Sequence, residues 1–474
     1  MIFVMNNKVK VVFKNTIYTF LSNFISFVIN ALVVLLIPKL IGVAEYGYFQ
    51  LYLLLCTYAL SFHLGWNDGI YLRYVGMDYD ELDKKNLSAQ FRGVCVLAVI
   101  WFIVLLGLIQ IFVSDVDKKC VYSMASLVVL IVTPRIFTSV VMQMVNYMKK
   151  YSLIILAEKC VYAIILIIML IFGVRDFKIL IISDIIGKIA SLILGVYFCR
   201  DIILQKPSKN KYLQYCVDAI KNIKIGFFLL ISNFASMLIT GIIQFAIENR
   251  WSMETFSKVS LTFNMSKMLL VVITALSVVL VPMLKHLSDD VLAKSYKRIR
   301  AILMFVLCGM LVFYYPMKVV LSIWLPQYKE SLVYMALLFP MCLFESKTSL
   351  LVNTYMKAMR EEKRLCLYNV ITVVVSAIVA IVTIFIFSNL FASIVAIPYL
   401  LAFRCLILEF YLQKKLNINL MKDAVIEIII ATLFIIFSWN IQSWLSVVLY
   451  LIIYLAYVIY IKDELKNAFK VLRK

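Results

Sequence analysis

Apolar runs of about 20 residues recur along the whole of this 474-residue chain. A helix needs about that length to cross the hydrocarbon core of a bilayer. The sequence is 64% hydrophobic and 15% charged, whereas soluble domains are about 45–50% apolar and about 25% charged. The alternating pattern typical of membrane β-barrels does not occur, which leaves helices as the spanning elements. The sequence therefore predicts an all-α integral membrane protein.

The apolar runs predict about 14 transmembrane helices. They cover residues 15–37, 47–64, 93–113, 120–144, 152–174, 177–198, 223–247, 256–284, 301–322, 332–356, 366–388, 391–412, 425–440 and 443–461. The predicted domains are an N-lobe of six spans, a cytoplasmic linker, a C-lobe of six spans, and two extra spans followed by a cytoplasmic amphipathic tail. Their boundaries are residues 1–200, 201–222, 223–414 and 415–474.

A short sequence repeat supports the two-lobe division. "LSNFISFVIN" at residues 21–30 returns as "ISNFASMLIT" at residues 231–240. Five of the eight positions from Ser22 to Ile29 are identical at a constant offset of 210. Chance is one explanation, because apolar segments use few residue types. The other is a duplication that gives two pseudo-symmetric lobes of six helices, related by an axis along the membrane normal.

Polar residues spaced by three or four positions share one face of a helix in four of the predicted spans. These residues are Thr16, Thr19, Asn23, Ser26 and Asn30 in span 1; Gln50, Thr57, Ser61 and Asp68 along span 2; Asn233, Ser236, Thr240 and Gln244 in span 7; and Ser260, Asn264, Lys267 and Thr274 in span 8. Hydrocarbon offers such side chains no partners. The stripes either hold helices together or line a wet cavity shared by both lobes.

The distribution of basic residues predicts the orientation of the chain. Most of the 47 Lys and Arg residues fall in loops that are cytoplasmic if both termini lie inside, so the prediction is N-in and C-in. The net charge of +21 is then membrane-surface charge, attracted to lipid headgroups rather than to nucleic acid. The last segment is expected to be an interfacial helix with Leu465, Phe469 and Leu472 toward lipid.

Nine charged residues are predicted to lie at membrane depth within the spans. They are Arg135, Lys159, Lys188, Lys267, Lys347 and Arg404 among the bases, and Glu158, Asp184 and Glu345 among the acids. Each costs about 2.5–3.5 kcal/mol at mid-helix on insertion scales, so their retention requires a reason. Ion pairing is one reason, and Asp184 and Lys188 are spaced to pair. The excess of cations suits an anionic ligand, whereas the acids are candidates for coupling to H⁺ or Na⁺.

The sequence contains no signature of an enzyme. GxxxxGK[ST] is absent, the two histidines and ten cysteines form no metal-ligand spacing, and no catalytic constellation occurs in a loop. We therefore predict no catalytic residues, metal or cofactor, apart from a possible coupling ion.

Two segments near the N-terminus resemble a known family. "PKLIGVAEYGYFQ" at residues 38–50 and "LGWNDGIYLRYVG" at residues 64–76 are similar to the turn motifs of bacterial polysaccharide repeat-unit (O-antigen type) flippases. These proteins belong to the multidrug/oligosaccharidyl-lipid/polysaccharide exporter superfamily. The resemblance implies a multi-pass protein of the bacterial cytoplasmic (inner) membrane. It also implies a substrate, an oligosaccharide on undecaprenyl diphosphate, moved by alternating access for O-antigen, capsule or exopolysaccharide synthesis.

With that substrate, the stripes and the deep cations take specific roles. Lys267 is the expected diphosphate anchor, with Arg135 and Lys347 as secondary candidates, and Asp68 and Arg73 lie at the cytoplasmic mouth. The sugar would contact Asn23, Asn30, Asn233 and Asn264, while the ion-coupling candidates are Glu345, Glu158 and Asp184. The resemblance implies membrane lipids, a polysaccharide polymerase and chain-length proteins as partners.

Three other functions stay open, of which a structural scaffold would need no charged cavity. A cation-coupled multidrug antiporter of the same superfamily would be marked by a functional acid in span 1, and none is present. A membrane glycosyltransferase or polymerase would need catalytic acids in a large outer loop, and no such loop is predicted.

Overall fold

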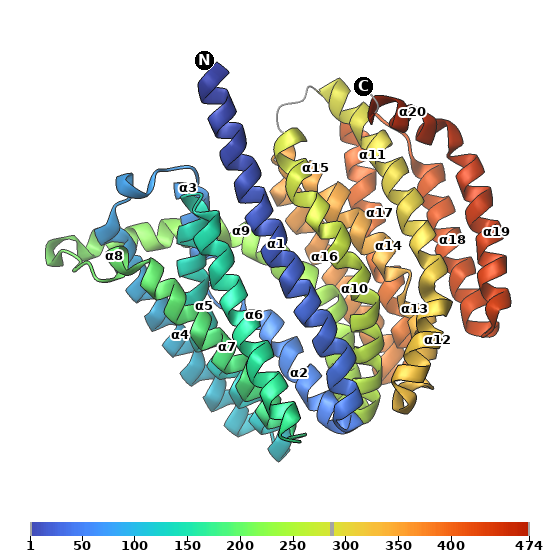
Figure 1. The fold of residues 1–474 in the computed structure, drawn as a ribbon, viewed down its shortest axis with the longest axis horizontal. Helices are drawn as coiled ribbons and strands as arrows, with labels where there is room; N and C mark the ends of the chain where they lie inside the picture. Colours follow the sequence, from blue (N-terminus) through green and yellow to red (C-terminus); the bar gives the residue numbers. More distant parts are fainter. Residues whose placement is uncertain (1, 285–288, 473–474) are drawn as a thin grey trace. The chain divides into compact units, whose positions relative to one another are not determined.

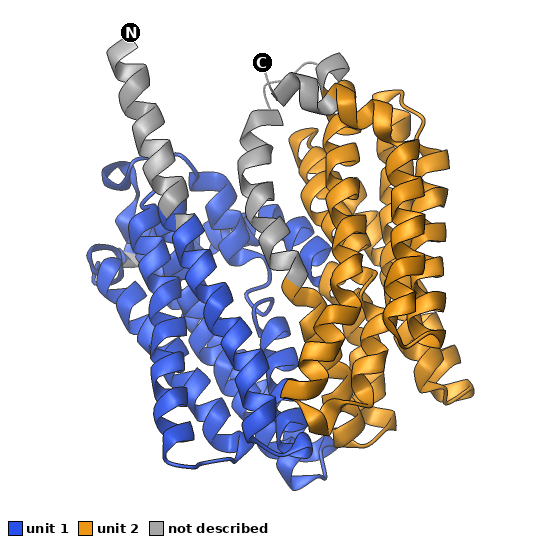
Figure 2. Ribbon diagram, turned by 45° about the vertical axis from the view of Figure 1, so that its right-hand side comes forward, with its two compact units in different colours: residues 1–234 blue, residues 235–474 orange. Residues whose placement is uncertain are grey.

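The computed structural model describes residues 2–284 and 289–472, and within them it leaves out the side chains of 2–17, 19, 209, 269–284, 289–291 and 468–472. Every element in these ranges is helical, which confirms the all-α class (Figure 1). The chain forms two compact units, Met1–Phe234 and Ala235–Lys474 (Figure 2). The boundary falls inside a long helix, α9 (Tyr212–Arg250), and not in a loop.

Unit 1 contains the first eight helices, two 3₁₀ turns and the first part of α9. Its elements are α1 (Ile2–Leu40), α2 (Val43–Ala59), α3 (Trp66–Tyr74), η1 (Tyr79–Glu81), α4 (Lys84–Phe112), α5 (Val116–Met144), α6 (Met148–Ile171), α7 (Phe177–Phe198), α8 (Arg200–Ile203) and η2 (Lys209–Lys211). Side-chain caps define several helix starts. The carboxylates of Asp83, Asp115 and Asp176 accept hydrogen bonds from the backbone N–H groups of Asn86, Lys118 and Lys178.

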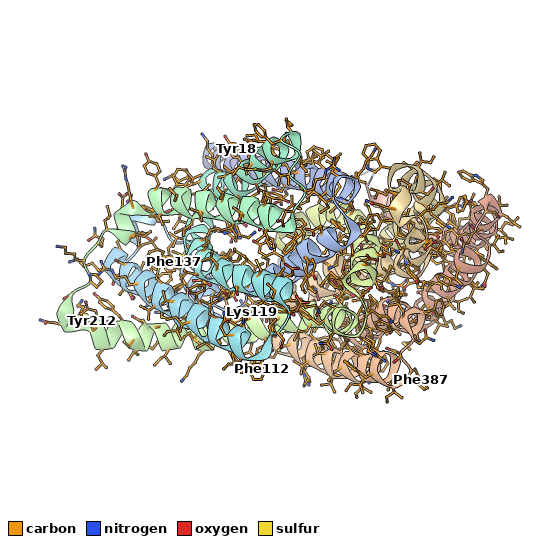
Figure 3. All side chains as sticks on the ribbon, turned by 90° about the horizontal axis from the view of Figure 1, so that it is seen from below. Tyr18, Phe112, Lys119, Phe137, Tyr212 and Phe387 are labelled. Carbon is orange, nitrogen blue, oxygen red and sulfur yellow. The ribbon has the colours of Figure 1, made fainter. Side chains whose placement is uncertain are left out.

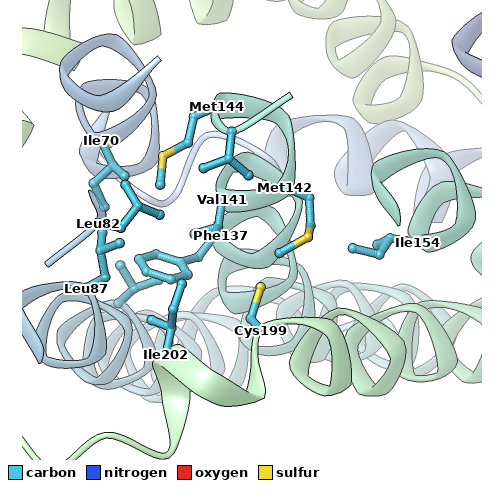
Figure 4. Packing of buried hydrophobic residues seen from close by; sticks show 12 residues of the cluster. Ile70, Leu82, Leu87, Phe137, Val141, Met142, Met144, Ile154, Cys199 and Ile202 are labelled. Atoms are coloured by element: carbon cyan, nitrogen blue, oxygen red, sulfur yellow. The ribbon is translucent and has the colours of Figure 1, made fainter. Parts of the chain in front are cut away.

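A hydrophobic cluster at one end of unit 1 fixes the short helix α3 in place. Ile70 of α3 is fully buried with Leu87 of α4, Phe137 of α5, Ile154 of α6 and Ile202 of α8 (Figure 4). Each such side chain contributes about 1.5–3 kcal/mol on burial. The functional residues around α3 therefore rest on a rigid base contributed by several helices.

Unit 2 contains the second part of α9 and the rest of the chain. Its elements are α10 (Met253–Leu284), α11 (Asp289–Met310), η3 (Leu311–Phe313), α12 (Tyr314–Trp324), η4 (Pro326–Tyr328), η5 (Ser331–Tyr334), α13 (Met335–Leu338), α14 (Met341–Ser346), η6 (Lys347–Val352), α15 (Asn353–Ala358), α16 (Glu362–Ala380), η7 (Ile381–Ile386), α17 (Leu390–Leu416), α18 (Met421–Asn440), α19 (Trp444–Tyr460) and α20 (Lys462–Leu472).

The tenth predicted span is broken in the structure. It bends by 40° between Leu338 and Met341, and Pro340 lies at this bend. A π-helical segment, η6, follows from Lys347 to Val352. Proline removes a backbone donor, and π-helical turns inside α-helices often mark functional sites. A helix that only crosses the membrane needs neither the bend nor the π-helical segment, so residues 340–352 are candidates for a functional role.

The apolar helices identify a multi-pass membrane protein. Within the described residues nine helices are long and apolar enough to cross a bilayer, or ten when the bent pair counts as one span. Large apolar side chains project outward, such as Phe112 in unit 1 (76% exposed) and Phe387 in unit 2 (70% exposed) (Figure 3). The exact number of fourteen spans and the orientation stay predictions. Leu465 was expected to face lipid, but it is buried, and its helix α20 packs on α11. Phe469 lies outside the described side chains, as does Leu472.

Candidate functional site

Unit 1 holds a cluster of charges at membrane depth, contributed by α2, α5, α6 and α7. Arg135 Nη1 on α5 donates to Glu158 Oε2 on α6 at 2.7 Å, and Lys159 lies 3.5 Å from the other oxygen of Glu158. On α7, Lys188 pairs with Asp184, as the spacing predicts. The Tyr52 hydroxyl of α2 donates to Asp184 Oδ2 at 2.7 Å. Both acids are therefore neutralised by basic partners.

This pairing bears on three predicted functional residues. Arg135, a candidate for the diphosphate, already binds Glu158, although its Nε–H has no hydrogen-bond partner among the described residues. Glu158 and Asp184, candidates for ion coupling, each bind a cation in this structure. Structural pairing, one of the two explanations open from the sequence, accounts for all three contacts.

Unit 2 holds a closed ring of four charges. Arg300 of α11 donates from Nε to Glu409 Oε1 at 2.9 Å and from Nη2 to Glu427 Oε1 at 2.5 Å. Lys347 of η6 donates to Glu409 Oε2 at 2.5 Å and to Glu427 Oε2 at 2.7 Å. The four side chains are 1–2% exposed. Each carboxylate bridges both cations, so the ring is electrically neutral and ties α11, η6, α17 and α18 together.

The ring removes Lys347 from the set of free cations. Lys347 is a predicted secondary site for the diphosphate, but two buried carboxylates already neutralise it. The Tyr296 hydroxyl also donates to Glu409 at 3.1 Å, and Arg300 lies 3.5 Å from Asp423. Lys347 is therefore not free to bind a diphosphate. The ring also gives the π-helical segment a physical reason, because Lys347 is its first residue.

The other deep acid of unit 2 is paired as well. Arg404 Nη1 lies 3.4 Å from Glu345 Oε2, and Arg404 Nε donates to Asn369 Oδ1 at 2.9 Å. Arg404 is fully buried, so it does not extend toward an aqueous surface. Glu345, a candidate for ion coupling, is 29% exposed in its side chain.

Lys267 differs from all the other deep cations. Its side chain is exposed, and no ion pair to it occurs in the part of the chain that the structure describes. Its Nζ lies 4.3 Å from the centre of the Phe263 ring, one turn earlier on α10. A cation over an aromatic face gains about 0.5–1 kcal/mol at an exposed site, much less than a salt bridge to a phosphate can supply. The acid that acts on Lys267 electrostatically is Glu345 of α14, which packs against α10, and Glu345 is itself paired with Arg404.

The two repeat copies share their pattern of exposure. Ser22 and Ser232 are buried, whereas Asn23 and Asn233 are exposed. Asn30 is also exposed, and Asn264 is half-buried. The duplication itself stays a prediction, but these amides have the accessibility that a wet wall requires. The side chains of Thr16, Thr19 and Thr274 lie outside the described residues.

Arg73, predicted at the cytoplasmic mouth, is held by the first part of α9. Its Nη1 donates to Asn222 Oδ1 at 2.7 Å, and its Nη2 lies 3.2 Å from Asp218 Oδ1. Asp218 accepts a further hydrogen bond from Asn86 of α4, at 3.1 Å. Arg73 therefore joins α3 to α9 and is not free for an anion.

Asp68, the other predicted mouth residue, has no such partner. Its nearest ionisable neighbour is His63, with Nε2 4.0 Å from Asp68 Oδ2. Burial raises the pKa of Asp68 to about 6. A carboxyl with this pKa changes its protonation within the physiological range, unlike ordinary aspartates, which ionise near pH 4.

Several of these partners were not predicted from the sequence. Glu409 and Glu427 lie within predicted spans 12 and 13 but are missing from the deep acids, so the predicted excess of cations was overestimated. Arg300 and Asp218 were assigned to cytoplasmic loops. The usable signal was the position of the two glutamates inside apolar runs, where an acid requires a cationic partner.

Comparison with known proteins identifies the family. A family model described as "Polysaccharide biosynthesis protein" matches residues 12–288. The chain belongs to this family. The resemblance seen in residues 38–50 and 64–76 is thereby confirmed at the family level, while the O-antigen type is not specifically supported. No curated protein matches the sequence.

Solved structures show the fold. A structure described as "Lipid II flippase MurJ, inward closed conformation" has a TM-score of 0.64 at 14% identity, over 95% of this chain and 99% of that chain. Multidrug resistance MATE family transporters of the MOP superfamily match in inward-facing (TM-score 0.60, 12% identity) and outward-facing (0.59, 10%) conformations. Both alignments cover 85% of this chain. They cover 94% of the inward-facing chain and 96% of the outward-facing chain. All of these similar structures are of membrane transporters.

Proposed function

We propose that the chain moves polyprenyl-diphosphate-linked oligosaccharide units across the cytoplasmic membrane for surface polysaccharide synthesis. Membership of the polysaccharide biosynthesis family supports the saccharide, and the fold shared with MurJ, described as a lipid II flippase, supports a lipid-linked substrate. Movement would follow alternating access, with H⁺ or Na⁺ as the coupling ion. O-antigen, capsule or exopolysaccharide units all fit this substrate class.

The observation that carries the proposal is the exposed, unpaired ammonium of Lys267. A charge at membrane depth is costly, and each of the five other cations predicted to lie deep in the spans has an acid within 4.0 Å among the described residues. Exposure to hydrocarbon would leave Lys267 unsolvated, so its environment is expected to be a wet surface. A diphosphate would supply the missing counter-charge. Exposed Asn23 and Asn233 would offer hydrogen bonds to a sugar.

Lys267 substitutions test this proposal. In a strain that lacks the native transporter, Lys267→Ala is expected to reduce surface polysaccharide at least tenfold, whereas Lys267→Arg retains partial activity because the charge survives. Lys267→Glu is expected to be at least as damaging as alanine through repulsion of the diphosphate. Blotting of membrane fractions controls for expression, and Lys422→Ala, at an exposed lysine of α18, is the matched control. Full polysaccharide production by Lys267→Ala would contradict the assignment.

The second candidate function is a cation-coupled multidrug antiporter, favoured by the likeness to MATE structures. That function requires a carboxylate able to bind and release a cation. Glu158, Asp184 and Glu345, the three predicted candidates for this role, are each paired with a basic side chain in the structure and are therefore less free to bind a cation. Resistance to cationic drugs, conferred on a sensitive strain by the wild-type chain, would support the antiporter instead.

A further inference from the structure

The turn between α2 and α3 presents two ionisable residues in an unusual geometry. Leu64 and Gly65 both have left-handed backbones, with φ of +53° and +80°. This turn brings the Gly65 amide N–H to His63 Nδ1, to which it donates at 3.1 Å. Because Nδ1 accepts this hydrogen bond, the neutral ring carries its proton on Nε2. His63 is 5% exposed and is held in this tautomer by the backbone.

Asp68 lies directly beyond that proton. The distance from His63 Nε2 to Asp68 Oδ2 is 4.0 Å, slightly too long for a hydrogen bond. No hydrogen bond to the Asp68 carboxylate is present among the described residues, and the side chain is 26% exposed. A partly buried carboxylate without donors is poorly stabilised as an anion. It can gain a proton from the water that reaches it, and the charge of the pair then changes from −1 to 0.

The charged groups on the surrounding helices are engaged elsewhere or exposed. Arg73 on α3 and Asp218 on α9 bind each other, and Arg135 on α5 binds Glu158. Lys221 and Lys224 of α9 are exposed, and the facing residues of α4 are the uncharged Gln90 and Gly93, which meet Trp66. The titratable group left on the adjoining part of α2 is the neutral phenol of Tyr58. No fixed cation of the described structure therefore holds Asp68 in its ionised form.

The turn between α2 and α3 is in close backbone contact with α9. A Cβ atom on Gly226 would lie 2.0 Å from the Gly65 carbonyl oxygen and 2.6 Å from Gly69 N, so the two backbones touch without intervening side chains. One and two helical turns earlier on α9, Arg73 binds Asn222 and Asp218. Because α9 runs on from unit 1 into unit 2, a change in this contact acts on the helix that joins them.

We propose that His63 and Asp68 form a proton-binding site whose occupancy alters how firmly the α2–α3 turn holds α9. The ligand is a single proton, which binds to the Asp68 carboxyl beside the imidazole Nε2–H. When Asp68 is ionised it attracts the Nε2–H of His63 across the 4.0 Å gap, and protonation weakens this attraction, which alters the position of α3 relative to Gly226. The link to substrate movement rests on the proposed transport function, but the proton site itself does not.

The first experiment measures the proton. Infrared difference spectra of the purified, full-length protein in nanodiscs, between pH 4.5 and 8, are compared for wild type, Asp68→Asn and Asp80→Asn. Asp80 is the matched control, because its side chain is 96% exposed in the adjoining loop. We expect a carboxylic-acid band with a midpoint near pH 6 that Asp68→Asn loses and Asp80→Asn keeps. His63→Phe should move the midpoint upward, because the Nε2–H dipole that favours the anion is removed. Identical spectra for wild type and Asp68→Asn would overturn the proposal.

The second experiment measures the grip on α9. Hydrogen exchange of residues 212–234 is followed at pH 5.5 and 7.5, corrected for the intrinsic pH dependence of exchange. Wild type is expected to show at least a threefold change in protection, and Asp68→Asn is expected to show none and to resemble wild type at pH 5.5. Equal pH dependence in both proteins would overturn the mechanical part of the proposal.

Complementation separates the two proposals. Suppose that the infrared and exchange experiments give the expected results. Loss of surface polysaccharide in Asp68→Asn but not in Asp80→Asn then links the proton to transport, whereas full polysaccharide production by Asp68→Asn overturns that link. Failure of the wild-type chain to complement would contradict the proposed saccharide function but would not bear on the proton site.

Discussion

Replacing Lys347 by methionine should destabilise unit 2 strongly. Lys347 Nζ contacts Glu409 at 2.5 Å and Glu427 at 2.7 Å, and all three side chains are about 1% exposed. Methionine has a similar length but no charge, so the two carboxylates would share Arg300 alone. At an effective dielectric constant of about 20, two unit charges roughly 3 Å apart attract by about 5 kcal/mol. Much of this is offset by desolvation, and breaking a buried pair costs about 3–5 kcal/mol in practice.

Thermal unfolding in detergent measures this loss. For a domain the size of unit 2, about 3–5 kcal/mol corresponds to a decrease in Tm of roughly 6–20 °C. The double variant Lys347→Met/Glu427→Gln restores neutrality around Arg300 and Glu409, and it should recover at least half of the loss. Lys422→Met removes an exposed lysine of α18 and should change stability by less than about 0.5 kcal/mol. A Tm for Lys347→Met within 2 °C of wild type would refute the view that the ring holds α18 to α11 and α17.

Three further outcomes are expected. Gly226→Ala places a Cβ 2.0 Å from a backbone oxygen and should cost at least about 3 kcal/mol in a thermal scan, whereas Gly107→Ala, with nothing within 4 Å, should be neutral. The raised pKa of Asp68 means that its stabilising contribution is complete below pH 4 and is lost as the pH rises through about 6. Wild-type stability relative to Asp68→Asn should therefore fall over this range, and a flat difference would contradict the burial. Reporter fusions after Lys414 and at Lys474 should report a cytoplasmic location, and a periplasmic signal at the C-terminus would mean that the last two spans were miscounted.

The helical class and most helix positions could be predicted because bilayer thickness and hydropathy act locally along the chain. Predicted spans 120–144 and 177–198 correspond to α5 and α7 within a few residues. Span 332–356 was predicted as one helix but is broken at Pro340 and continues as a π-helix. Hydropathy carries no information on this break, because the bent segment is as apolar as a straight one. The buried ring around Lys347 explains why the helix departs from regular geometry here. The carboxylates that bind Lys347 lie 62 and 80 positions further along the chain, so no local pattern reveals them.

The candidate site was predictable in its residue types but not in its pairings. A charge inside an apolar run signals that a partner exists, as Glu158 and Lys347 illustrate, yet only tertiary structure reveals which partner. Arg135 meets Glu158 across two helices, and Arg73 meets Asp218, which the sequence placed in the cytoplasmic linker. A local spacing rule found only the pair within one helix, Asp184 and Lys188.

The pairings also change which charges point to function. A buried cation that is matched by a carboxylate explains its own retention through stability, so Arg135, Lys347 and Arg404 need no ligand. Two groups remain after this subtraction among the described residues. Lys267 is an exposed ammonium with no acid within 4.0 Å in the described part of the chain, and Asp68 is a half-buried carboxyl whose neighbouring base is the neutral imidazole of His63. The first lacks an anion and the second lacks a proton, which are the two species that a proton-linked carrier of an anionic lipid must bind. These two charges of opposite sign, one in each unit, therefore point to function more directly than the eight paired ones.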